Sequence, residues 1–450
     1  MKKYIALAFL CTSGFLKAQT DSGKFNLTEA IAFAEKNSPT LKNAMLDKDI
    51  SRETVKQVAA AGLPQVSASG NLLQYTQVPG NWVKNFVPSP GAPEYVFIRF
   101  QQPINAVASL TMNQLIYSGT FLLGLKAAKE FTNLSSLAYV KTKADLQVNV
   151  AKAYLMALTV KKNIEMVNGN LLLLEKSLSD VEKLNAEGFA EKLDVQRLKL
   201  AVSNLKVQKE KLLAASDATM NLLKLQMGYD VNKQIELTDD LETIDKSIPA
   251  LSNADFNVKN RIEYKLINQG LSLSKLDEKR YKVGKYPTIV GFFQHQQSTL
   301  RPEFNFFQSN LTPNNNWVPS SAFGLSLQMT LFDGFRAKSS IAEIKLKRQK
   351  TENDLFSFTN AANMEYSNAV RNYNTSAQLV ELQKENMDLA REIYTKSNLK
   401  YKEGVGSSLE VVQAENDLKT AQASYLNAIY DLVISKIDLK KANGTEITQP

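Results

Sequence analysis

The sequence predicts a mainly helical protein that also carries membrane-spanning β-strands, built from one unit that occurs twice. Three features predict this class. Two long stretches, 104–248 and 320–449, contain no proline, and proline blocks helix interiors, so very long helices are permitted. Two other windows are almost uncharged and alternate apolar with small or polar residues, as strands do. Motifs of the first half also recur in the second half at nearly constant spacing.

Composition excludes several kinds of site. A single His295 and a single Cys11 cannot build a His/Cys metal centre. The 44% hydrophobic content argues against a disordered chain, and no apolar run is long enough for an ordinary transmembrane helix. The excess of 54 basic over 45 acidic residues is modest, so we expect no nucleic-acid partner. No Walker A pattern appears, and Gly404-Val-Gly406 lacks the third glycine of a dinucleotide loop, so we expect neither a cofactor nor enzyme activity.

The N-terminus is typical of a secretory signal peptide. Two lysines precede the apolar segment 5–10, and Ala18 offers a small residue for cleavage. Cys11 suggests a lipoprotein anchor, but Leu10 stands before it where a small residue is expected, so we favour cleavage. Removal of residues 1–18 would lower the net charge from +9 to +6 and leave no cysteine, so stability must come from packing.

The two nearly uncharged windows, 64–118 and 287–333, are predicted to hold two strands each. They contain six charged residues in 102 positions, against 22% for the whole chain. In the clearest strand, 323–331, apolar residues alternate with Gly, Ser, Gln and Thr. The other strand segments are 66–72, 110–116 and 289–296. The residues of the clearest strand expected to face lipid are Phe323, Leu325, Leu327, Met329 and Leu331.

Alternation alone would also fit a soluble β-sandwich. The near-absence of charge, the strand length of about nine to eleven residues and the aromatic residues near strand ends favour a membrane-spanning barrel. Both tryptophans, Trp82 and Trp317, lie in these windows. Four strands cannot close a barrel, and open strand edges are not tolerated in lipid, so several chains must share one barrel.

The proline-free stretches carry the heptad patterns of long, closely packed helices. Gly188 interrupts the first stretch, and Gly404 and Gly406 interrupt the second. Each stretch is therefore expected to fold as a helical hairpin with a glycine-containing tip. The seam of large residues is Val411, Leu418, Tyr425, Leu432 and Leu439, and the seam of small residues is Ala414, Ala421, Ala428, Ser435 and Ala442.

The two halves of the chain match each other. The difference in residue number between matched positions is 216 at the tips, 215 at the end of the strand windows and 223 at their start. This small variation is explained by a difference in length of the loop between the strands. The matched positions are Gly188 with Gly404, Gly228 with Gly444, 115–119 with 330–334, and Pro64 with Pro287. One unit of short helix, strand, loop, strand, long helix, tip and helix is therefore repeated.

These residues resemble the TolC-like outer-membrane efflux family, the outer membrane factors, over essentially the whole mature chain. The resemblance rests on the order, spacing and duplication of several motifs. They are Leu27-Thr-Glu-Ala-Ile31, Ala61-Gly-Leu-Pro-Gln65, Leu331-Phe-Asp-Gly334, and Tyr401-Lys-Glu-Gly404 followed by Leu409-Glu-Val411 and Ala414-Glu415.

The resemblance implies a homotrimer in the outer membrane of a Gram-negative bacterium. Each chain would give four strands to one twelve-stranded β-barrel that is continuous with a hollow helical barrel in the periplasm. The assembly would be a passive exit duct of a tripartite efflux or type I secretion system. A periplasmic adaptor (membrane fusion) protein and an inner-membrane pump would be its partners, and the pump would supply both energy and selection.

The domain organisation follows from the repeat and the resemblance together. We expect a signal peptide at 1–18. The first repeat would then have N-terminal helices at 19–63, a strand pair with an extracellular loop at 64–118, and a long helical hairpin at 119–228 with its tip near 188. The second repeat would have a linker with short helices at 229–286, a strand pair with an extracellular loop at 287–333, and a long hairpin at 334–444 with its tip near 404–407, followed by a C-terminal tail at 445–450.

The resemblance also assigns roles to residues at the tips. Glu410 matches a position where the family often places an acid that lines the closed periplasmic entrance, and Gln413 stands where a second acid is frequent, which leaves a doubled acidic ring in doubt. His295 is expected in the barrel or a loop without a ligand role. The residues expected to contact the adaptor are Gly188, Phe189, Ala190, Gly404, Val405, Gly406 and Ser407.

Two other classes of protein share some of these features. A periplasmic adaptor has a long helical hairpin, but only one, and it has no duplicated uncharged strand pairs. A coiled-coil structural protein of the envelope would have no reason for the alternating segment 323–331.

Overall fold

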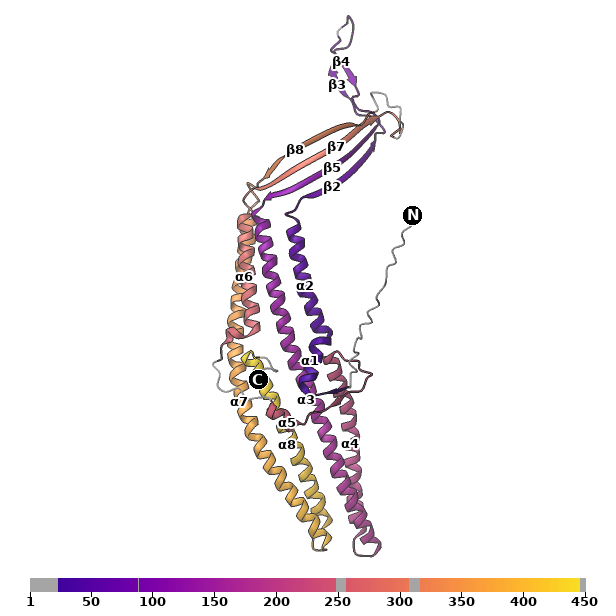
Figure 1. Cartoon of the computed structure of the whole chain (residues 1–450), viewed down its shortest axis with the longest axis vertical. Coiled ribbons are helices and arrows are strands. Elements are labelled where there is room, and N and C mark those ends of the chain that lie inside the picture. Colours follow the sequence, from indigo (N-terminus) through magenta and orange to yellow (C-terminus); the bar gives the residue numbers. More distant parts are fainter. Residues whose placement is uncertain (1–22, 88, 248–255, 307–315, 446–450) are drawn as a thin grey trace, which may run out of the picture. The chain divides into compact units, whose positions relative to one another are not determined.

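The structure is a computed structural model that describes residues 23–87, 89–247, 256–306 and 316–445, without the side chains of 245–247. The chain divides into two compact units (Figure 1). The first contains residues 1–43, 141–261 and 361–450, and the second contains residues 44–140 and 262–360. The predicted signal peptide, with Cys11, and nearly all of the predicted tail lie outside the described residues.

The second unit contains a four-stranded antiparallel sheet in the order β2-β5-β7-β8. The two repeats meet in its middle, where β5 of the first repeat pairs with β7 of the second. Strands β2 and β8 occupy the two edges. The strands are β2 (Gln65–Gln74), β5 (Ile104–Tyr117), β7 (Thr288–Arg301) and β8 (Val318–Gln328).

The strand limits differ from those expected from alternation. The inner strands β5 and β7 are 14 residues long, because each pairs on both sides. Strand β8 begins before the predicted segment and includes Pro319, which an edge strand tolerates. It ends at Gln328, so the placement of Met329 and Leu331 within a strand was wrong: both follow β8 where no partner strand continues the ladder.

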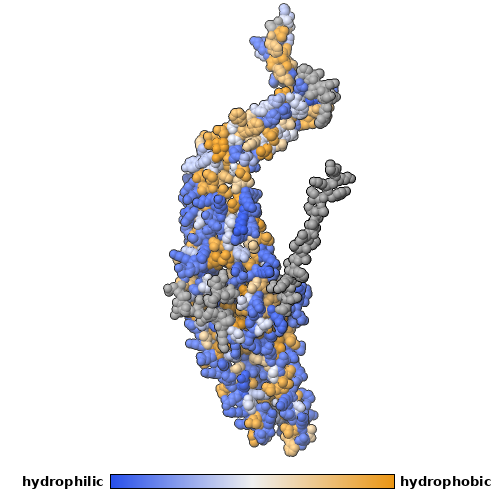
Figure 2. All heavy atoms as spheres, viewed as in Figure 1, coloured by the Kyte–Doolittle hydropathy of each residue, from blue (hydrophilic) through white to orange (hydrophobic). Residues whose placement is uncertain are grey.

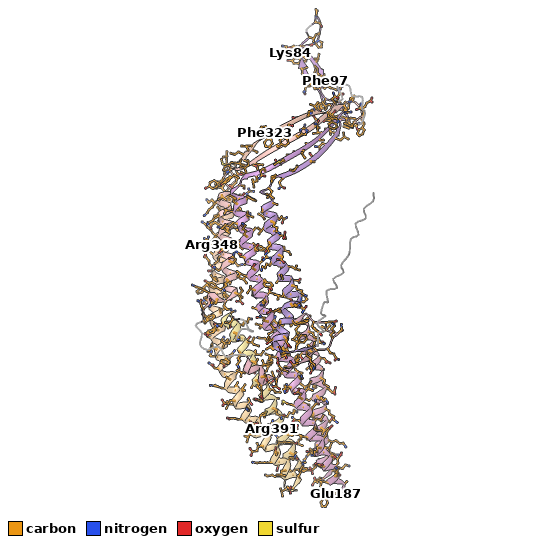
Figure 3. All side chains as sticks on the ribbon, in the orientation of Figure 1. Lys84, Phe97, Glu187, Phe323, Arg348 and Arg391 are labelled. Carbon is orange, nitrogen blue, oxygen red and sulfur yellow. The ribbon has the colours of Figure 1, made fainter. Side chains whose placement is uncertain are left out.

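The loop between β2 and β5 holds a hairpin that the sequence analysis did not predict. Strand β3 (Asn81–Lys84) pairs antiparallel with β4 (Tyr95–Ile98), and the rings of Trp82 and Phe97 meet edge to face with centroids 5.4 Å apart. Figure 3 labels Lys84 and Phe97 on this hairpin. Alternation does not reveal these strands, because Asn81–Lys84 has two adjacent apolar residues and Tyr95–Ile98 is apolar throughout.

The helical part of the second unit is tied together by polar contacts between helices. Gln269 donates to a carboxylate oxygen of Glu130 at 2.8 Å, and Arg348 pairs with Glu278 at 2.7 Å (Figure 3 labels Arg348). The contacting elements are α6 (Ile262–Val283) and parts of α3 (Gly119–Ala186) and α7 (Arg336–Lys402). Part of α2 (Pro39–Ala60) also lies in this unit.

In the first unit, α3 and α7 each turn back into a shorter helix, α4 (Lys192–Met227) and α8 (Ser408–Asn443) respectively. Burial along α8 confirms both heptad seams as core positions. Tyr425 and Ala421 are half-buried and the other eight members are buried. Figure 3 labels Arg391 on α7 and Glu187 at the end of α3.

Short elements join the hairpins of the first unit. Strand β1 (Lys24–Phe25) pairs in parallel with β6 (Glu236–Leu237), and the buried Tyr154 hydroxyl donates to the Phe25 carbonyl at 2.9 Å. Buried Arg261 satisfies the end of α8 by donating to the Ala442 carbonyl at 3.0 Å. The remaining elements are α1 (Leu27–Asn37), α5 (Leu241–Ser247) and the 3-10 helix η1 (Val258–Asn260).

No helix in the described part of the chain has both the length and the apolar character needed to cross a membrane.

Candidate functional site

The first tip is a rigid turn between α3 and α4. Gly188 has φ 82°, a left-handed conformation that glycine adopts without the penalty of a Cβ atom. The Phe189 amide donates to the Leu184 carbonyl at 2.8 Å, and the Asn185 side chain donates to the Ala190 carbonyl at 2.6 Å. These bonds hold Phe189 outward with 80% of its surface exposed. Ala190 is half-buried, because it packs on the hydrophobic cluster of its own hairpin.

The second tip repeats this design between α7 and α8. Gly404 is also left-handed, with φ 74°, and the amides of Val405 and Gly406 both donate to the Lys400 carbonyl at 3.1 Å. A Cβ atom on Gly406 would lie 3.0 Å from the Tyr401 backbone nitrogen, so the turn requires glycine there as well. Val405 is 78% exposed.

Ser407 starts α8 as its N-cap. Its hydroxyl accepts from the Glu410 amide at 3.3 Å, which satisfies one of the free amides of the first turn. The next residue, Ser408, is buried and its hydroxyl hydrogen-bonds to the Asp194 carboxylate of the first hairpin. Tyr401 and Val412 pack on the hydrophobic cluster of that hairpin. The structure therefore brings the two predicted tips together within the first unit.

The predicted entrance residues lie on an exposed stripe of α8. Glu410 and Gln413 are both exposed, and Gln413 donates to the Asp417 carboxylate at 3.0 Å. Asp417 is seven residues, or about two turns, after Glu410, and it is exposed on the same side of the helix. The sequence analysis missed Asp417, although its spacing from Glu410 was the available signal.

Glu415 was read only as part of a family motif, and the structure buries it. Its residue surface is 6% exposed, and its Oε1 atom has no hydrogen-bond partner among the described residues. Burial raises the pKa of this carboxyl, and Lys419 opposes the shift. Glu415 is buried because of its position on the helix. Together with Val411, Ala414 and Leu418 it completes the i, i+3, i+4, i+7 pattern of a face that packs against the core.

The second unit holds the other predicted site, the apolar face of the sheet. Phe323, Leu325 and Leu327 are exposed on one face of β8, and Phe323 (labelled in Figure 3) is 86% exposed. In the ladder they lie opposite Phe293, Gly291 and Ile289 of β7. Figure 2 shows hydrophobic residues along this sheet.

The opposite face of the sheet is uncharged and mixes polar side chains with apolar ones such as Val290 and Phe292. Ser326, Thr111 and Ser69 are among its residues, and the Ser69 and Ser109 hydroxyls hydrogen-bond across strands at 2.7 Å. His295 lies on the apolar face, where its Nδ1 is 2.8 Å from the Ser321 hydroxyl. Within the described ranges, no group of three or more His, Cys, Asp or Glu residues could hold a metal ion.

With this geometry in place, comparison with known proteins identifies the family. The family model described as "Outer membrane efflux protein" matches residues 30–227 and 282–445. The chain belongs to the outer membrane efflux protein family. Members of this family are outer-membrane channels and not enzymes, which confirms the predicted kind of protein and its location in the outer membrane and periplasm.

The curated relatives have low sequence identity to this chain, but they align with it over long stretches. The outer membrane protein TolC of Vibrio cholerae serotype O1 is 21% identical over 454 residues, which cover 99% of this chain and 96% of that protein. The probable efflux pump outer membrane protein SepC of Pseudomonas putida is 21% identical over 320 residues, 68% of this chain and 63% of that protein.

Solved structures confirm the predicted fold class of helical and β-barrel channel. A structure of CusC has a TM-score of 0.74 at 15% identity, covering 93% of this chain and 92% of that one. VceC from Vibrio cholerae has a TM-score of 0.70 at 16% identity, covering 94% of this chain and 96% of that one. The Campylobacter jejuni CmeC outer membrane channel has a TM-score of 0.72 at 14% identity, covering 94% and 87%.

Proposed function

We propose that three copies of this chain form one passive exit duct through the outer membrane. The observation that carries this proposal is the pair of unpaired sheet edges. Within the described residues, the outer edges of β2 and β8 have no partner strand, and lipid does not tolerate open edges. Three sheets of four strands would close into a twelve-stranded barrel, an even number above the smallest single-chain size.

The internal repeat supplies a register for the missing pairing. The β5–β7 ladder joins the end of one repeat to the start of the next, so β8 of one chain should pair with β2 of its neighbour in the same way. Applying the offsets of 215 and 223 to this ladder places Ser326 opposite Asn71 and Leu327 opposite Gly70.

Exposed apolar residues on the helices also favour an assembly. Large hydrophobic side chains recur along α3, α4 and α7 with more than 60% of their surface exposed. Exposed side chains of this size would lose contact with water if a neighbouring chain covered them. The residues are Leu172, Leu200, Leu225, Leu346, Phe356 and Met364.

In this assembly the apolar face of the sheet contacts lipid and the uncharged polar face lines the lumen. The loops 75–103 and 302–317 then lie on the extracellular side, and the helices extend into the periplasm. The Ser, Thr and Asn residues of this face can form hydrogen bonds with water, and they add no charge to the lumen of the barrel.

The tips would dock on a periplasmic adaptor that links the duct to an inner-membrane pump. Phe189 and Val405 are large apolar residues held outward by rigid turns, which is the arrangement of an interface anchor. SepC is described as a "probable efflux pump outer membrane protein", which supports the same role for this chain. The inner stripe of Glu410 and Asp417 would give the entrance two rings of negative charge in the trimer.

Cysteine cross-linking tests the assembly and its register together. Cys11 in the predicted leader is the only cysteine of the sequence, so Asn71→Cys/Ser326→Cys introduces the only pair in the mature chain. Oxidation should give a covalent trimer that is extracted from the outer membrane only with detergent. The control Asn71→Cys/Ser320→Cys moves one thiol about 20 Å along the same face and should not cross-link. A soluble monomer, or equal cross-linking of both pairs, would contradict the proposal.

A further inference from the structure

We infer that the junction between β8 and α7 binds the headgroup of an anionic phospholipid in the periplasm-facing leaflet of the outer membrane. This inference rests on the proposed orientation of the duct. The junction contains a cavity of about 400 Å³ within the second unit, lined by the turn after α6 and the start of α7. Its lining includes Lys285, Lys338, Asp333, Leu331, Phe332 and Phe335.

The cavity has an excess of positive charge. Lys285 and Lys338 are exposed, and neither has an ion pair within the described part of the chain. Asp333 is the one acid of the lining, and its Oδ2 accepts from the Ala337 amide at 2.8 Å, where it caps the first turn of α7. The N-terminal end of α7 adds a partial positive charge. These groups suit a phosphate.

The other half of the lining is apolar and faces outward. Leu331, Phe332 and Phe335 are all largely exposed, and the two rings meet edge to face at 5.4 Å. Phe335 has φ 66°, the only left-handed non-glycine residue among those described. This backbone conformation is energetically unfavourable for a residue that has a Cβ atom, and such outliers cluster at functional sites. Aromatic rings beside cations at the end of a lipid-facing sheet are typical of a membrane interface.

The corresponding junction of the first repeat is closed by the chain itself. There, a Cβ atom on Gly119 would lie 3.2 Å from the Val283 Cβ, whereas one on Gly334 would have no neighbour within 4 Å. A neighbouring copy would bring its 61–65 turn toward this open junction. That turn, Ala-Gly-Leu-Pro-Gln, has no acid that could pair with Lys285 or Lys338, so it leaves both charges unmatched, whereas the headgroup of an anionic phospholipid would match them.

The test is native mass spectrometry of the detergent-purified protein titrated with phosphatidylglycerol or phosphatidylcholine. Wild type should retain phosphatidylglycerol preferentially, and Lys285→Gln/Lys338→Gln should weaken that retention about thirtyfold. The control Lys345→Gln/Lys350→Gln removes the same charge from exposed, unpaired positions farther along α7 and should retain lipid as wild type does. Phe335→Gly relieves the strained backbone and removes the ring, so it should lower retention without lowering thermal stability.

Several results would overturn the inference. They are unchanged retention in Lys285→Gln/Lys338→Gln, equal retention of the two lipids by wild type, or loss of the trimer in this variant with lipid retention intact. Lipid is counted per chain, so the measurement tests the cavity whatever the oligomeric state. A wild-type monomer would contradict the proposed assembly and not the lipid site.

Discussion

A lysine placed at the middle of β8 should block membrane assembly, and its effect should depend on face and depth. Phe323 lies at the centre of β8, opposite Phe293, with 86% of its surface exposed on the apolar face. A cation on the lipid face near the bilayer midplane costs about 2–4 kcal/mol per chain, so three copies cost on the order of 10 kcal/mol in a trimer. Phe323→Lys should therefore leave little trimer.

Two matched variants separate face from depth. Ala322→Lys places the same charge one residue away on the opposite, polar face, so the trimer should form. Leu327→Lys keeps the apolar face but lies one residue before the end of β8, where the cost falls to about 0–1 kcal/mol. The assay is the fraction of heat-modifiable trimer in the outer-membrane fraction on denaturing gels. Equal assembly of Phe323→Lys and Ala322→Lys would refute the assignment of faces, and equal loss with Leu327→Lys would refute the depth.

Three further outcomes are expected at the tips. Glu410→Gln should lower cation preference in planar-bilayer conductance at low salt, and Asp417→Asn should lower it further, because carboxylates around an aperture attract cations; unchanged selectivity would place both away from the constriction. Phe189→Asp/Val405→Asp should abolish capture by a co-expressed adaptor and leave trimer yield unchanged, whereas retained capture would contradict docking at the tips. Glu415→Gln should stabilise the tip by about 1–2 kcal/mol, measured by hydrogen exchange in α8, because it removes a buried carboxyl whose Oε1 has no hydrogen-bond partner among the described residues.

The pH dependence of Glu415 has a defined sign. Its pKa is raised in the folded protein, so the folded state holds the proton more tightly than the unfolded state. Stability of the tip is then greatest at acidic pH, where both states are protonated, and declines as pH rises above the ordinary glutamate pKa. Glu415→Gln should remove this dependence. Equal dependence of exchange on pH in wild type and variant would show that another group titrates.

Elements whose sequence pattern repeats over many residues could be predicted from the sequence. Two helical hairpins, their glycine tips and four alternating strands follow from patterns that repeat over many residues, so single exceptions do not hide them. The limits of strands could not be predicted, because the end of a strand depends on its partner: β5 and β7 reach 14 residues through pairing on two sides, and β8 stops at Gln328. A pattern within one strand does not contain that information.

The burial of a single polar residue among core positions could not be predicted from the sequence. The heptad seams at Val411, Ala414 and Leu418 were read correctly as packing, yet the same geometry requires that the residue between two of them also faces the core. Glu415 is that residue, and a charged side chain is ordinarily assigned to a solvated face. Burying it leaves its Oε1 atom without a hydrogen-bond partner in the part of the chain that the structure describes, a cost that packing alone does not explain. Glutamine has nearly the same shape without an ionisable group, so the Glu415→Gln variant measures the cost of the buried acid separately from the packing of the seam.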